Sequence, residues 1–529
     1  MFLREIEVKG KKYLYIVKTY REKGKVKQKC IACLGNLKHI QNSDQLRKIA
    51  YALLRYSNTK GSIFDITGMK EKARKIWGSV KVYRKIWDEI CLSELFSKLI
   101  RNTKVKFDFF SAVFLMVLDR LMCPQSKLKS YQKQDKYYGI KENKLQYLYR
   151  ALDVLARYKE DIEVYLFEKQ RNLFNMEINI VFYDVTTLYF ESTKADILRE
   201  FGFSKDCKMN EVQIVLGLLI DQVGRPIGFD IFAGNKFEGH TLREAIKKIE
   251  RRFGIKRLIF VGDRAMLSKE NIEIIRGAKY EYIVGSRIRN MERRIKEEIF
   301  KENGYEKVEI GEGEVFMYKE IKLGDGDRLI CSWSEKRARS DREKRERLIK
   351  MAKDIIEKGN YGSVSKRGAK RYIKADRIKF LGLDIEKIEE DKRWDGYYGV
   401  RTNCSEISKR KVLEIYHDLW KVEEAFRILK SQIEARPIFH WSPMRIKGHL
   451  VLCFIAFLLE RTLEIKLKEK KIECSAYDIR EVLNNLQFSV IEIEGESFYL
   501  FSPVEGLANK ILRALKIAIP SKISIPEKF

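Results

Sequence analysis

Three acidic side chains are placed where they could hold a metal ion: Asp184, Asp263 and Glu423. The first ends the apolar run "INIVFYD" (178–184), and the second ends "RLIFVGD" (257–263). A lone carboxylate is costly to remove from water, and two carboxylates forced together repel one another. A divalent cation between them offsets both effects, and Mg²⁺ suits a site with few protein carboxylates. The alternative is that each Asp caps the turn after its strand.

The third carboxylate belongs to a segment with helical periodicity, 408–433. Its apolar stripe comprises Ile415, Leu419, Val422, Phe426 and Leu429. Beside this stripe, Tyr416, Glu423 and Lys430 recur every seven residues, which is close to two helical turns. We expect Glu423 to reach a metal while the phenol and the ammonium hold a phosphate backbone. The alternative is an i,i+4 pair of Glu423 with Arg427 on an ordinary amphipathic helix.

The elements that would bring the first two acids together follow the order β-β-β-α-β-α-β. The predicted strands are 178–184, 212–221, 226–232, 257–263 and 280–286. A capping box of Thr241 and Glu244 predicts the start of the first helix, and Ser268 and Gly277 bound the second. The first three strands should form an antiparallel meander, and the fourth should run parallel to one of them. This order suits a ribonuclease-H-like sheet. No G-x-G-x-x-G or Walker loop is present in the sequence, so we expect no nucleotide cofactor.

The flanking segments differ in pattern. Residues 1–37 alternate and break at Lys23-Gly24-Lys25, which predicts a β-hairpin. Residues from about 40 to 175 are helical in pattern, with strong helices at 107–122, stopped by Pro124, and at 145–158. Residues 290–395 are hydrophilic, and 336–350 holds eight basic and three acidic residues. That stretch is either a solvated helix with i,i+4 pairs or a phosphate-binding surface.

The composition points to a polyanionic partner. The 529 residues include 106 Lys and Arg against 75 Asp and Glu, a net charge of +31. Nucleic acid is the first candidate, and a lysine-rich proteome is the alternative. Nine scattered cysteines favour free thiols in a reducing compartment, and we interpret the one C-x-x-C, Cys30 to Cys33, as structural. The most apolar stretch, 449–461, falls short of the ~20 residues of a membrane span and predicts a buried helix.

The chain resembles the DDE transposases of bacterial and archaeal insertion sequences, in the branch with a Tyr-x2-Arg-x3-Glu-x6-Lys signature. Tyr416, Glu423 and Lys430 match three of the four signature positions. "FYDVTTLYFES" around Asp184 and "FVGDRAMLS" around Asp263 resemble the two acidic motifs, including the Asp-Arg pair.

One signature position departs from the family, because Leu419 stands where the Arg is expected and is followed by Trp420 and Lys421. A similar subgroup has a helix like "YHDLWKVEEAFRILKS" that continues as "ARPIFHW" (435–441). "SKLKSY" (126–131) and the amino-terminal hairpin also resemble that subgroup.

The resemblance implies an α/β fold with a ribonuclease-H-like catalytic core, a mixed five-stranded sheet flanked by helices, interrupted by an insertion domain. The 160 residues between Asp263 and Glu423 independently call for an insertion, whose class stays open. The expected parts are a hairpin region (1–40), a helical DNA-binding region (41–175), the core (176–290 and 396–475), the insertion (291–395) and a carboxyl-terminal region (476–529).

The resemblance also implies a reaction: metal-dependent cleavage of DNA and strand transfer, with two Mg²⁺ ions, or Mn²⁺ in their place, held by the three acids. Arg264, Tyr416 and Lys430 would orient phosphates, with Arg427 and Lys421 nearby, and Trp420 would stack on an unpaired base or fill the core. The expected partners are the terminal inverted repeats and target DNA, bound by a homodimer in the prokaryotic cytoplasm. The alternatives are a metal-dependent nuclease without strand transfer and a domesticated DNA-binding protein.

Overall fold

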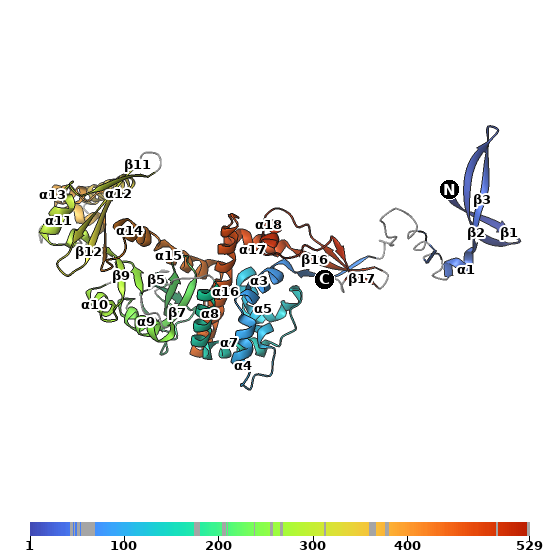
Figure 1. Cartoon of the computed structure of the whole chain (residues 1–529), viewed down its shortest axis with the longest axis horizontal. Helices are drawn as coiled ribbons and strands as arrows, with labels where there is room; N and C mark the ends of the chain where they lie inside the picture. The colour runs from blue at the N-terminus through green and yellow to red at the C-terminus, as the bar shows by residue number, and fades with distance from the viewer. Residues whose placement is uncertain are drawn as a thin grey trace. The chain divides into compact units, whose positions relative to one another are not determined.

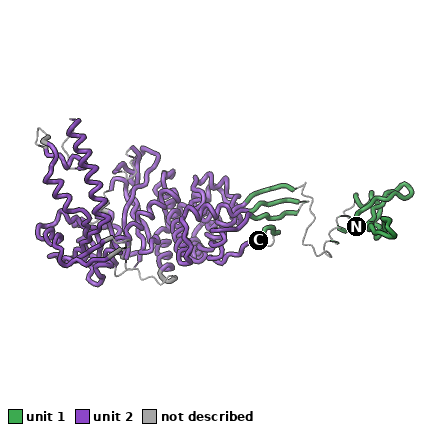
Figure 2. Tube along the Cα trace, turned by 90° about the horizontal axis from the view of Figure 1, so that it is seen from above, with its two compact units in different colours: residues 1–74, 488–501, 520–529 green, residues 75–487, 502–519 purple. Residues whose placement is uncertain are grey.

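The structure is a computed structural model. With a few single positions besides, it describes residues 1–42, 69–173, 180–203, 210–236, 238–253, 258–264, 268–310, 314–358, 367–375, 380–493 and 496–525. The chain forms two compact units (Figure 2). The first comprises Met1–Arg74, Phe488–Phe501 and Pro520–Phe529, and the second comprises Lys75–Gln487 and Ser502–Ile519. All predicted site residues belong to the second unit.

The amino terminus forms an antiparallel sheet of β1 (Phe2–Val8), β2 (Lys11–Glu22) and β3 (Lys25–Asn36), followed by α1 (Leu37–Asn42). The predicted break at Lys23-Gly24 is the β2–β3 turn, and Lys9-Gly10 makes the β1–β2 turn. All four turn residues have positive φ, as tight hairpins with a right-handed strand twist require. The predicted hairpin is therefore two strands of a three-stranded meander. A separate sheet has the order β18-β17-β16-β4 (Ile523–Ser524, Glu496–Phe501, Gln487–Ile493 and Lys70–Ile76).

Helices dominate the part of the second unit that precedes the central sheet. They are α3 (Gly78–Glu89), α4 (Leu92–Ile100), α5 (Phe109–Met122), α6 (Lys127–Gln132), α7 (Leu145–Arg157) and α8 (Lys159–Leu173). Helix α5 is buried on almost every side, as its continuous apolar sequence predicts, and it ends before Pro124. It packs with α7 against α16 (Pro443–Glu469). Among the described helices, none is both long and apolar enough to cross a membrane.

The central sheet contains nine strands within the described residues, in the order β10-β11-β12-β15-β9-β8-β5-β6-β7. Their bounds are β5 (Ile180–Tyr189), β6 (Gln213–Asp221), β7 (Pro226–Ala233), β8 (Ile259–Gly262), β9 (Glu281–Ser286), β10 (Glu306–Ile310), β11 (Glu314–Lys322), β12 (Arg328–Ser334) and β15 (Tyr397–Thr402). Strands β5 to β7 form the expected antiparallel meander, and β8 lies parallel to β5. The prediction of five strands was too low, because β15 pairs with both β9 and β12 and so joins β10–β12 to the same sheet.

Two helices cover one face of this sheet: α9 (Glu238–Phe253) and α10 (Lys269–Gly277). The predicted Ser268 cap and the end of α10 at Gly277 are confirmed. The predicted capping box is wrong, because α9 begins at Glu238 and Thr241 lies inside it. Thr241 is fully buried, and its hydroxyl pairs with that of Tyr183 at 3.1 Å. The Thr241 hydroxyl, which the sequence pattern assigned to a helix cap, instead forms a hydrogen bond with the buried phenol of Tyr183.

The predicted continuous helix over 408–433 is also wrong. It divides into α14 (Lys409–His417), α15 (Trp420–Arg427) and a π-helical turn, η5 (Ile428–Gln432). The break is a tightened turn, since the Leu419 N–H bonds the Tyr416 carbonyl and the Val422 N–H bonds the Leu419 carbonyl, three residues back in each case. Four residues of the predicted stripe are nevertheless buried, and Leu419 is partly buried. Figure 1 shows α14 and α15 on the side of the sheet away from α9 and α10.

The remaining elements of 291–395 surround two small cores of their own. They are α11 (Arg293–Phe300), α12 (Glu335–Glu357), the 3₁₀ turn η4 (Gly368–Tyr372), β13 (Ile373–Ala375), β14 (Phe380–Leu383) and α13 (Ile385–Lys392). This segment therefore mixes helices and strands. The 3₁₀ turn η3 (Ile288–Asn290) precedes it, and α17 (Ala476–Asn485) and α18 (Gly506–Ala514) lie near the carboxyl terminus.

Candidate functional site

Asp184 lies on β5, and Asp263 directly follows the neighbouring parallel strand β8. Strand β5 pairs with β8 through Ile180–Ile259, Val181–Phe260 and Phe182–Val261. Continuing this offset by two residues sets Asp184 opposite Asp263, immediately after β8 ends at Gly262. The sequence suggested that Asp184 is the last residue of its strand. This is wrong, because β5 continues to Tyr189, paired with β6 alone. Asp184 lies instead where β5 loses β8 as a neighbour.

Both acids belong to the face of the sheet that α9 and α10 leave uncovered. Side chains alternate along a strand, and Tyr183, Val185 and Phe260 are all in the core beneath α9 and α10. Asp184 and Asp263 therefore fall on the opposite face. Leu218, directly across from Asp184 on β6, and Leu429 of η5 line the same small apolar cavity. Glu423 thus lies on the same side of the sheet as the two aspartates, on α15, which packs against β5 and β6.

The three carboxylates do not form a tight cluster. Among the described residues, no group of three His, Cys, Asp or Glu side chains is close enough together to hold a metal ion. Asp184 is partly buried, and its Oδ1 lies 2.7 Å from the Val185 amide nitrogen. Asp263 and Glu423 are exposed. The fold therefore brings the two aspartates to one sheet edge and Glu423 to the same face, without closing the site.

Tyr416 is the signature residue that the structure does connect to this edge. Its hydroxyl lies 2.6 Å from that of Tyr398 on β15, and both Asp263 and Arg264 act electrostatically on its phenol. Burial, reinforced by Tyr398, raises the pKa of Tyr416 far above its ordinary value, so the hydroxyl keeps its proton. Gly285 on β9 makes this meeting possible, because a Cβ there would collide with both hydroxyl oxygens.

The other predicted DNA contacts differ in their surroundings. Trp420 is 47% exposed, which argues against a place in the core. Lys421 donates to the Gln222 carbonyl at 2.7 Å and pairs with Asp418, so it fastens α15 to the β6–β7 turn. Arg427 is largely exposed and pairs with Glu424 at 3.7 Å rather than with Glu423. Lys430 is partly buried.

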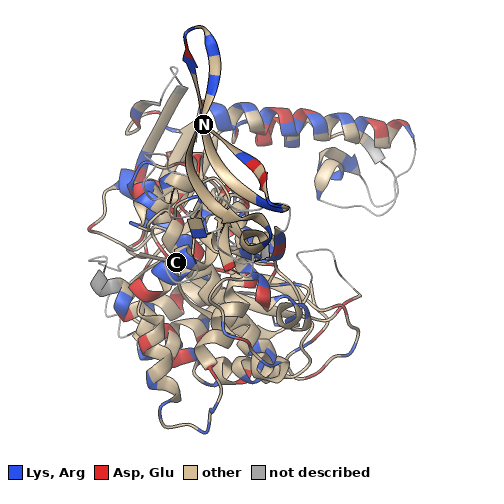
Figure 3. Ribbon diagram, turned by 90° about the vertical axis from the view of Figure 1, so that its right-hand side faces the viewer, with Lys and Arg blue, Asp and Glu red and all other residues tan. Residues whose placement is uncertain are grey.

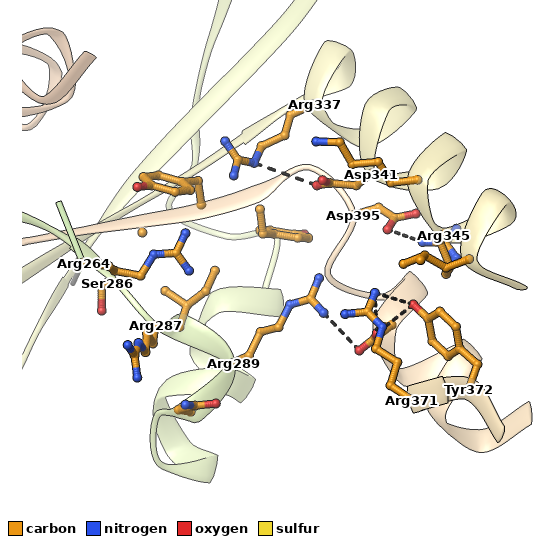
Figure 4. Close-up of a pocket in the computed structure, with 18 residues that line it drawn as sticks. Arg264, Ser286, Arg287, Arg289, Arg337, Asp341, Arg345, Arg371, Tyr372 and Asp395 are labelled. Atoms are coloured by element: carbon orange, nitrogen blue, oxygen red, sulfur yellow. Dashed lines mark hydrogen bonds and ion pairs between the residues drawn. The ribbon is translucent and has the colours of Figure 1, made fainter. Parts of the chain in front are cut away.

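Arg264 opens onto a cleft of about 470 Å³ between the sheet, η3 and α12 (Figure 4). Seven basic side chains line it against three acidic ones: Arg264, Arg287, Arg289, Arg337, Lys344, Arg345 and Arg371, with Asp341, Asp391 and Asp395. We call it the basic cleft. The guanidinium groups of Arg264 and Arg337 lie 5.7 and 4.4 Å from the centre of the Tyr398 ring.

Each carboxylate of the basic cleft is matched to an arginine. Asp391 pairs with Arg289 at 3.0 Å and with Arg371 at 3.5 Å, while Asp341 lies 3.9 Å from Arg337. Asp395 bonds Arg345 (Figure 4). The remaining basic side chains leave an excess of positive charge that suits a phosphate backbone.

Part of this cleft was predicted from the sequence, because α12 supplies Arg337, Lys344 and Arg345 from the basic stretch 336–350. Lys and Arg are interspersed with Asp and Glu along this long helix (Figure 3), where Arg339 and Glu335 form one of the predicted i,i+4 pairs at 3.8 Å. Tyr398 was not predicted to belong to the site. Contacts across β9, β15 and α14 give that residue its importance, and no local pattern encodes them.

Comparison with known proteins identifies the family of the chain. Residues 175–459 match the family described as the transposase DDE domain, and this range contains every predicted site residue. The chain belongs to the DDE transposase family. It is a DNA transposase, and its residues 3–62 match the amino-terminal domain of IS1634 family transposases.

Two solved structures share low sequence identity with the transposase. One is a cryo-EM structure of a piggyBac transposase synaptic complex with hairpin DNA, 9% identical over 77% of this chain and 79% of that chain, with a TM-score of 0.38. The other is the Argonaute of Marinitoga piezophila with a 5′ OH guide RNA, 9% identical over 77% of this chain and 67% of that chain, with a TM-score of 0.18. No curated protein matches the chain.

Proposed function

We propose that the transposase cleaves and joins DNA at a metal site formed by Asp184, Asp263 and Glu423 on a ribonuclease-H-like core. The observation that carries the proposal is the β5–β8 register, whose continuation sets the two aspartates opposite each other, with Tyr416 close enough to interact electrostatically with Asp263. Carboxylate oxygens are the ligands that Mg²⁺ prefers, and Mn²⁺ accepts the same set. Completing the site requires Glu423 to approach the aspartates. Irregular turns on both sides of α15 would let this short helix adjust.

The proposed reaction has two displacements at phosphorus. In the first, a water molecule loses a proton as its oxygen bonds to the scissile phosphorus, and the bond to the 3′ oxygen breaks. That oxygen takes up a proton and leaves as a 3′-hydroxyl. In the second, the 3′-hydroxyl loses its proton as its oxygen bonds to a target phosphorus. The bond from that phosphorus to the target 3′ oxygen breaks, and this oxygen takes up a proton and leaves as a 3′-hydroxyl. Two bound metal ions would supply charge stabilisation of the attacking and leaving oxygens.

The chain's other residues would position DNA. Tyr416 and Arg264, which meet at Tyr398, would donate hydrogen bonds to phosphate oxygens next to the reacting group. Lys430 would hold the next phosphates, and Arg427 and the exposed ring of Trp420 would contact the strand near the cut. Lys421 would act through α15, which it anchors.

The basic cleft would continue this path along the backbone. As predicted from the sequence, the helical region 41–175 and the basic segment 291–395 would bind the terminal inverted repeats. A homodimer would pair the two ends of the element in the cytoplasm. Such binding should weaken steeply with salt, because it releases counterions from the phosphates.

Single substitutions test the metal site. Asp184→Asn, Asp263→Asn and Glu423→Gln should each lower Mg²⁺-dependent cleavage by about 10³-fold or more, since several kcal/mol of charge stabilisation depend on the metal. The substrate is a duplex carrying the DNA that flanks the reading frame. Glu414→Gln on α14 is the matched control, because its carboxylate pairs only with exposed Arg410 and Lys411 among the described residues. A variant that cleaves normally would remove its residue from the site, and a strand-transfer assay separates a transposase from a nuclease.

A further inference from the structure

A second cavity, of about 210 Å³, lies between the α5–α6 connection and the loop that follows η5. Its walls come from Gln125–Lys127 on one side and from residues 434–440 on the other, with His449 of α16 behind. These are the segments "SKLKSY" and "ARPIFHW" that stood out in the sequence. The chemistry proposed at the sheet edge uses neither of them.

Lys127 is the unusual member of this cavity. It is only 4% exposed, yet among the described residues no hydrogen bond or ion pair holds its ammonium. A buried charge without a partner is expensive, so buried lysines are normally paired. Burial, together with the nearby Arg120, lowers the pKa of Lys127 to about 7.

Two arginines add positive charge to the same cavity. Arg120 is 8% exposed, and its guanidinium donates hydrogen bonds to the backbone carbonyls of Gln125, Ile433 and Glu434. These neutral carbonyls fix its position and leave its charge uncompensated. Arg436 lies across the ring of Tyr189, with the guanidinium 5.3 Å from the ring centre.

Little negative charge opposes this group. Glu434 lines the cavity but is exposed, and Asp119 acts on Lys127 from the α5 side, where it bonds Tyr137. Burial lowers the pKa of His440 to about 3, so its ring is neutral. The His449 Nε2 lies 3.2 Å from the Ala435 carbonyl, which can only accept, so this nitrogen carries the proton and ties down the loop.

The mouth of the cavity carries exposed aromatic rings. Phe439, which lines the cavity, is 65% exposed, and Trp441, two residues further along the chain, is 58% exposed. The guanidinium of Arg199 lies 4.9 Å from the Trp441 ring centre, which holds that ring in place. Rings presented in this way beside a cationic hollow are suited to nucleic-acid bases, which stack on any aromatic face.

We propose that this cavity is a phosphate-binding site for the DNA backbone, in which Lys127, Arg120 and Arg436 enclose one phosphate group while Phe439 and Trp441 contact the adjoining bases. A phosphate supplies the negative charge that the buried cations lack, and its oxygens accept from lysine and arginine at once. The choice of DNA over free phosphate rests on the proposed function.

The position of the cavity relative to the acids sets a spacing. The Ile438 N–H bonds the carbonyl of Tyr189, the last residue of β5, five residues beyond Asp184. At roughly 3.3 Å per residue this is about 17 Å along the strand. Duplex phosphates recur every ~3.4 Å of helix axis on each strand, so the bound phosphate would lie about five nucleotides from the cut.

The test uses the full-length chain with Lys127→Met, and with Lys129→Met as the matched control on the same helix, where the side chain is exposed. We expect Lys127→Met to weaken DNA binding by about 10-fold or more and to reduce the slope of log affinity against log salt by ~0.9, the value for one phosphate. Lys129→Met should do neither.

A methylphosphonate scan locates the contact. A neutral linkage at one position, about five nucleotides from the cut, should weaken binding to the wild type and to Lys129→Met but not to Lys127→Met. If no linkage shows this dependence on Lys127, the proposal is overturned. Because the scan measures binding, it stands even if cleavage is absent and the proposed function fails.

Inorganic phosphate separates the two sources of the anion. It should raise the melting temperature of the wild type and of Lys129→Met and leave Lys127→Met unchanged. Suppose that phosphate raises the melting temperature only when Lys127 is present, while Lys127→Met binds DNA as well as the wild type does. That result would overturn the DNA assignment in favour of free phosphate. Should Lys127→Met fail to fold, Phe439→Ala and Trp441→Ala, which alter exposed rings, must weaken DNA binding, and unchanged binding by both overturns the proposal.

Discussion

Two lysines of the transposase are equally buried and have opposite surroundings. Lys159 and Lys127 are both 4% exposed. The ammonium of Lys159 donates to both oxygens of Glu163, at 2.7 and 2.8 Å, and Arg252 joins the same carboxylate at 3.0 Å. Lys127 faces a cavity and two arginines. Burial lowers the pKa of both lysines, but Glu163 opposes this at Lys159 while Arg120 adds to it at Lys127.

The difference separates two uses of a buried charge. The Lys159 network links α8 to β7 and α9, since Arg252 also bonds Asp230 at 2.9 Å and Glu163 accepts from the Phe229 amide at 2.9 Å. Its charges are satisfied within the chain. The charge of Lys127 is not, so its cost is offset only when an anion enters the cavity. One lysine holds the fold together, and the other is poised for a ligand.

The largest expected effect is at Lys159. Lys159→Met should lower the free energy of unfolding by about 3 kcal/mol, because it breaks a buried pair and leaves Glu163 with Arg252 alone. Urea denaturation measures this. Removing both charges, as Lys159→Met with Glu163→Gln, should recover part of the loss. A single variant as stable as the wild type would contradict a structural role for the pair.

Lys127→Met should act in the opposite direction. Replacing a buried, uncompensated ammonium by an apolar side chain of similar length should raise the free energy of unfolding by about 1 kcal/mol in the absence of DNA. The same variant should bind DNA less well, and this opposition of stability and binding distinguishes a ligand site from a structural lysine. A destabilised Lys127→Met protein would erase the contrast with Lys159.

The pH dependence sharpens the contrast further. The folded pKa of Lys127 is about 7, and that of an unfolded lysine is ~10.4. Between these values the unfolded state binds more protons, so this residue makes the free energy of unfolding rise with pH. The advantage of Lys127→Met over the wild type should therefore be full below pH 7 and shrink toward pH 10. Arg120, Asp119, Cys453 and the His440 and His449 rings share this environment, and the variant-minus-wild-type difference isolates the lysine. A difference that does not change with pH would refute the assignment.

The smallest effect on stability is expected in the basic cleft. Arg337 is 45% exposed, and its pair with Asp341 spans 3.9 Å. Arg337→Gln should change the free energy of unfolding by no more than about 0.5 kcal/mol, because solvent screens such pairs. Its DNA affinity should fall most at low salt. Thermal unfolding and a salt titration of DNA binding check both, and a large loss of stability would make Arg337 structural.

Local patterns in the sequence were sufficient for much of the fold. Strands β6, β7 and β9, helix α5 and the Ser268 cap follow from periodicity and capping, which act between residues close in sequence. Helix α9 began earlier than its apparent capping box, because the buried hydroxyl of Tyr183 needed Thr241. The helix over 408–433 broke at Leu419, although its apolar stripe remained largely buried. At α9 a contact between distant segments replaced the capping role of Thr241, whereas the break at Leu419 is a local tightening of the helix.

The sequence by itself determined which residues are candidates for the site and which residues share a face of a strand or helix, because side-chain alternation and helical period are set by neighbouring residues. It gave Asp184, Asp263 and the spacing of Tyr416 and Glu423. Only the tertiary structure decided the register of β5 against β8, the meeting of Tyr416 with Tyr398 across Gly285, and the burial of Lys127 beside Arg120. These depend on how strands and helices pack, and packing is a property of segments that the chain places far apart in sequence.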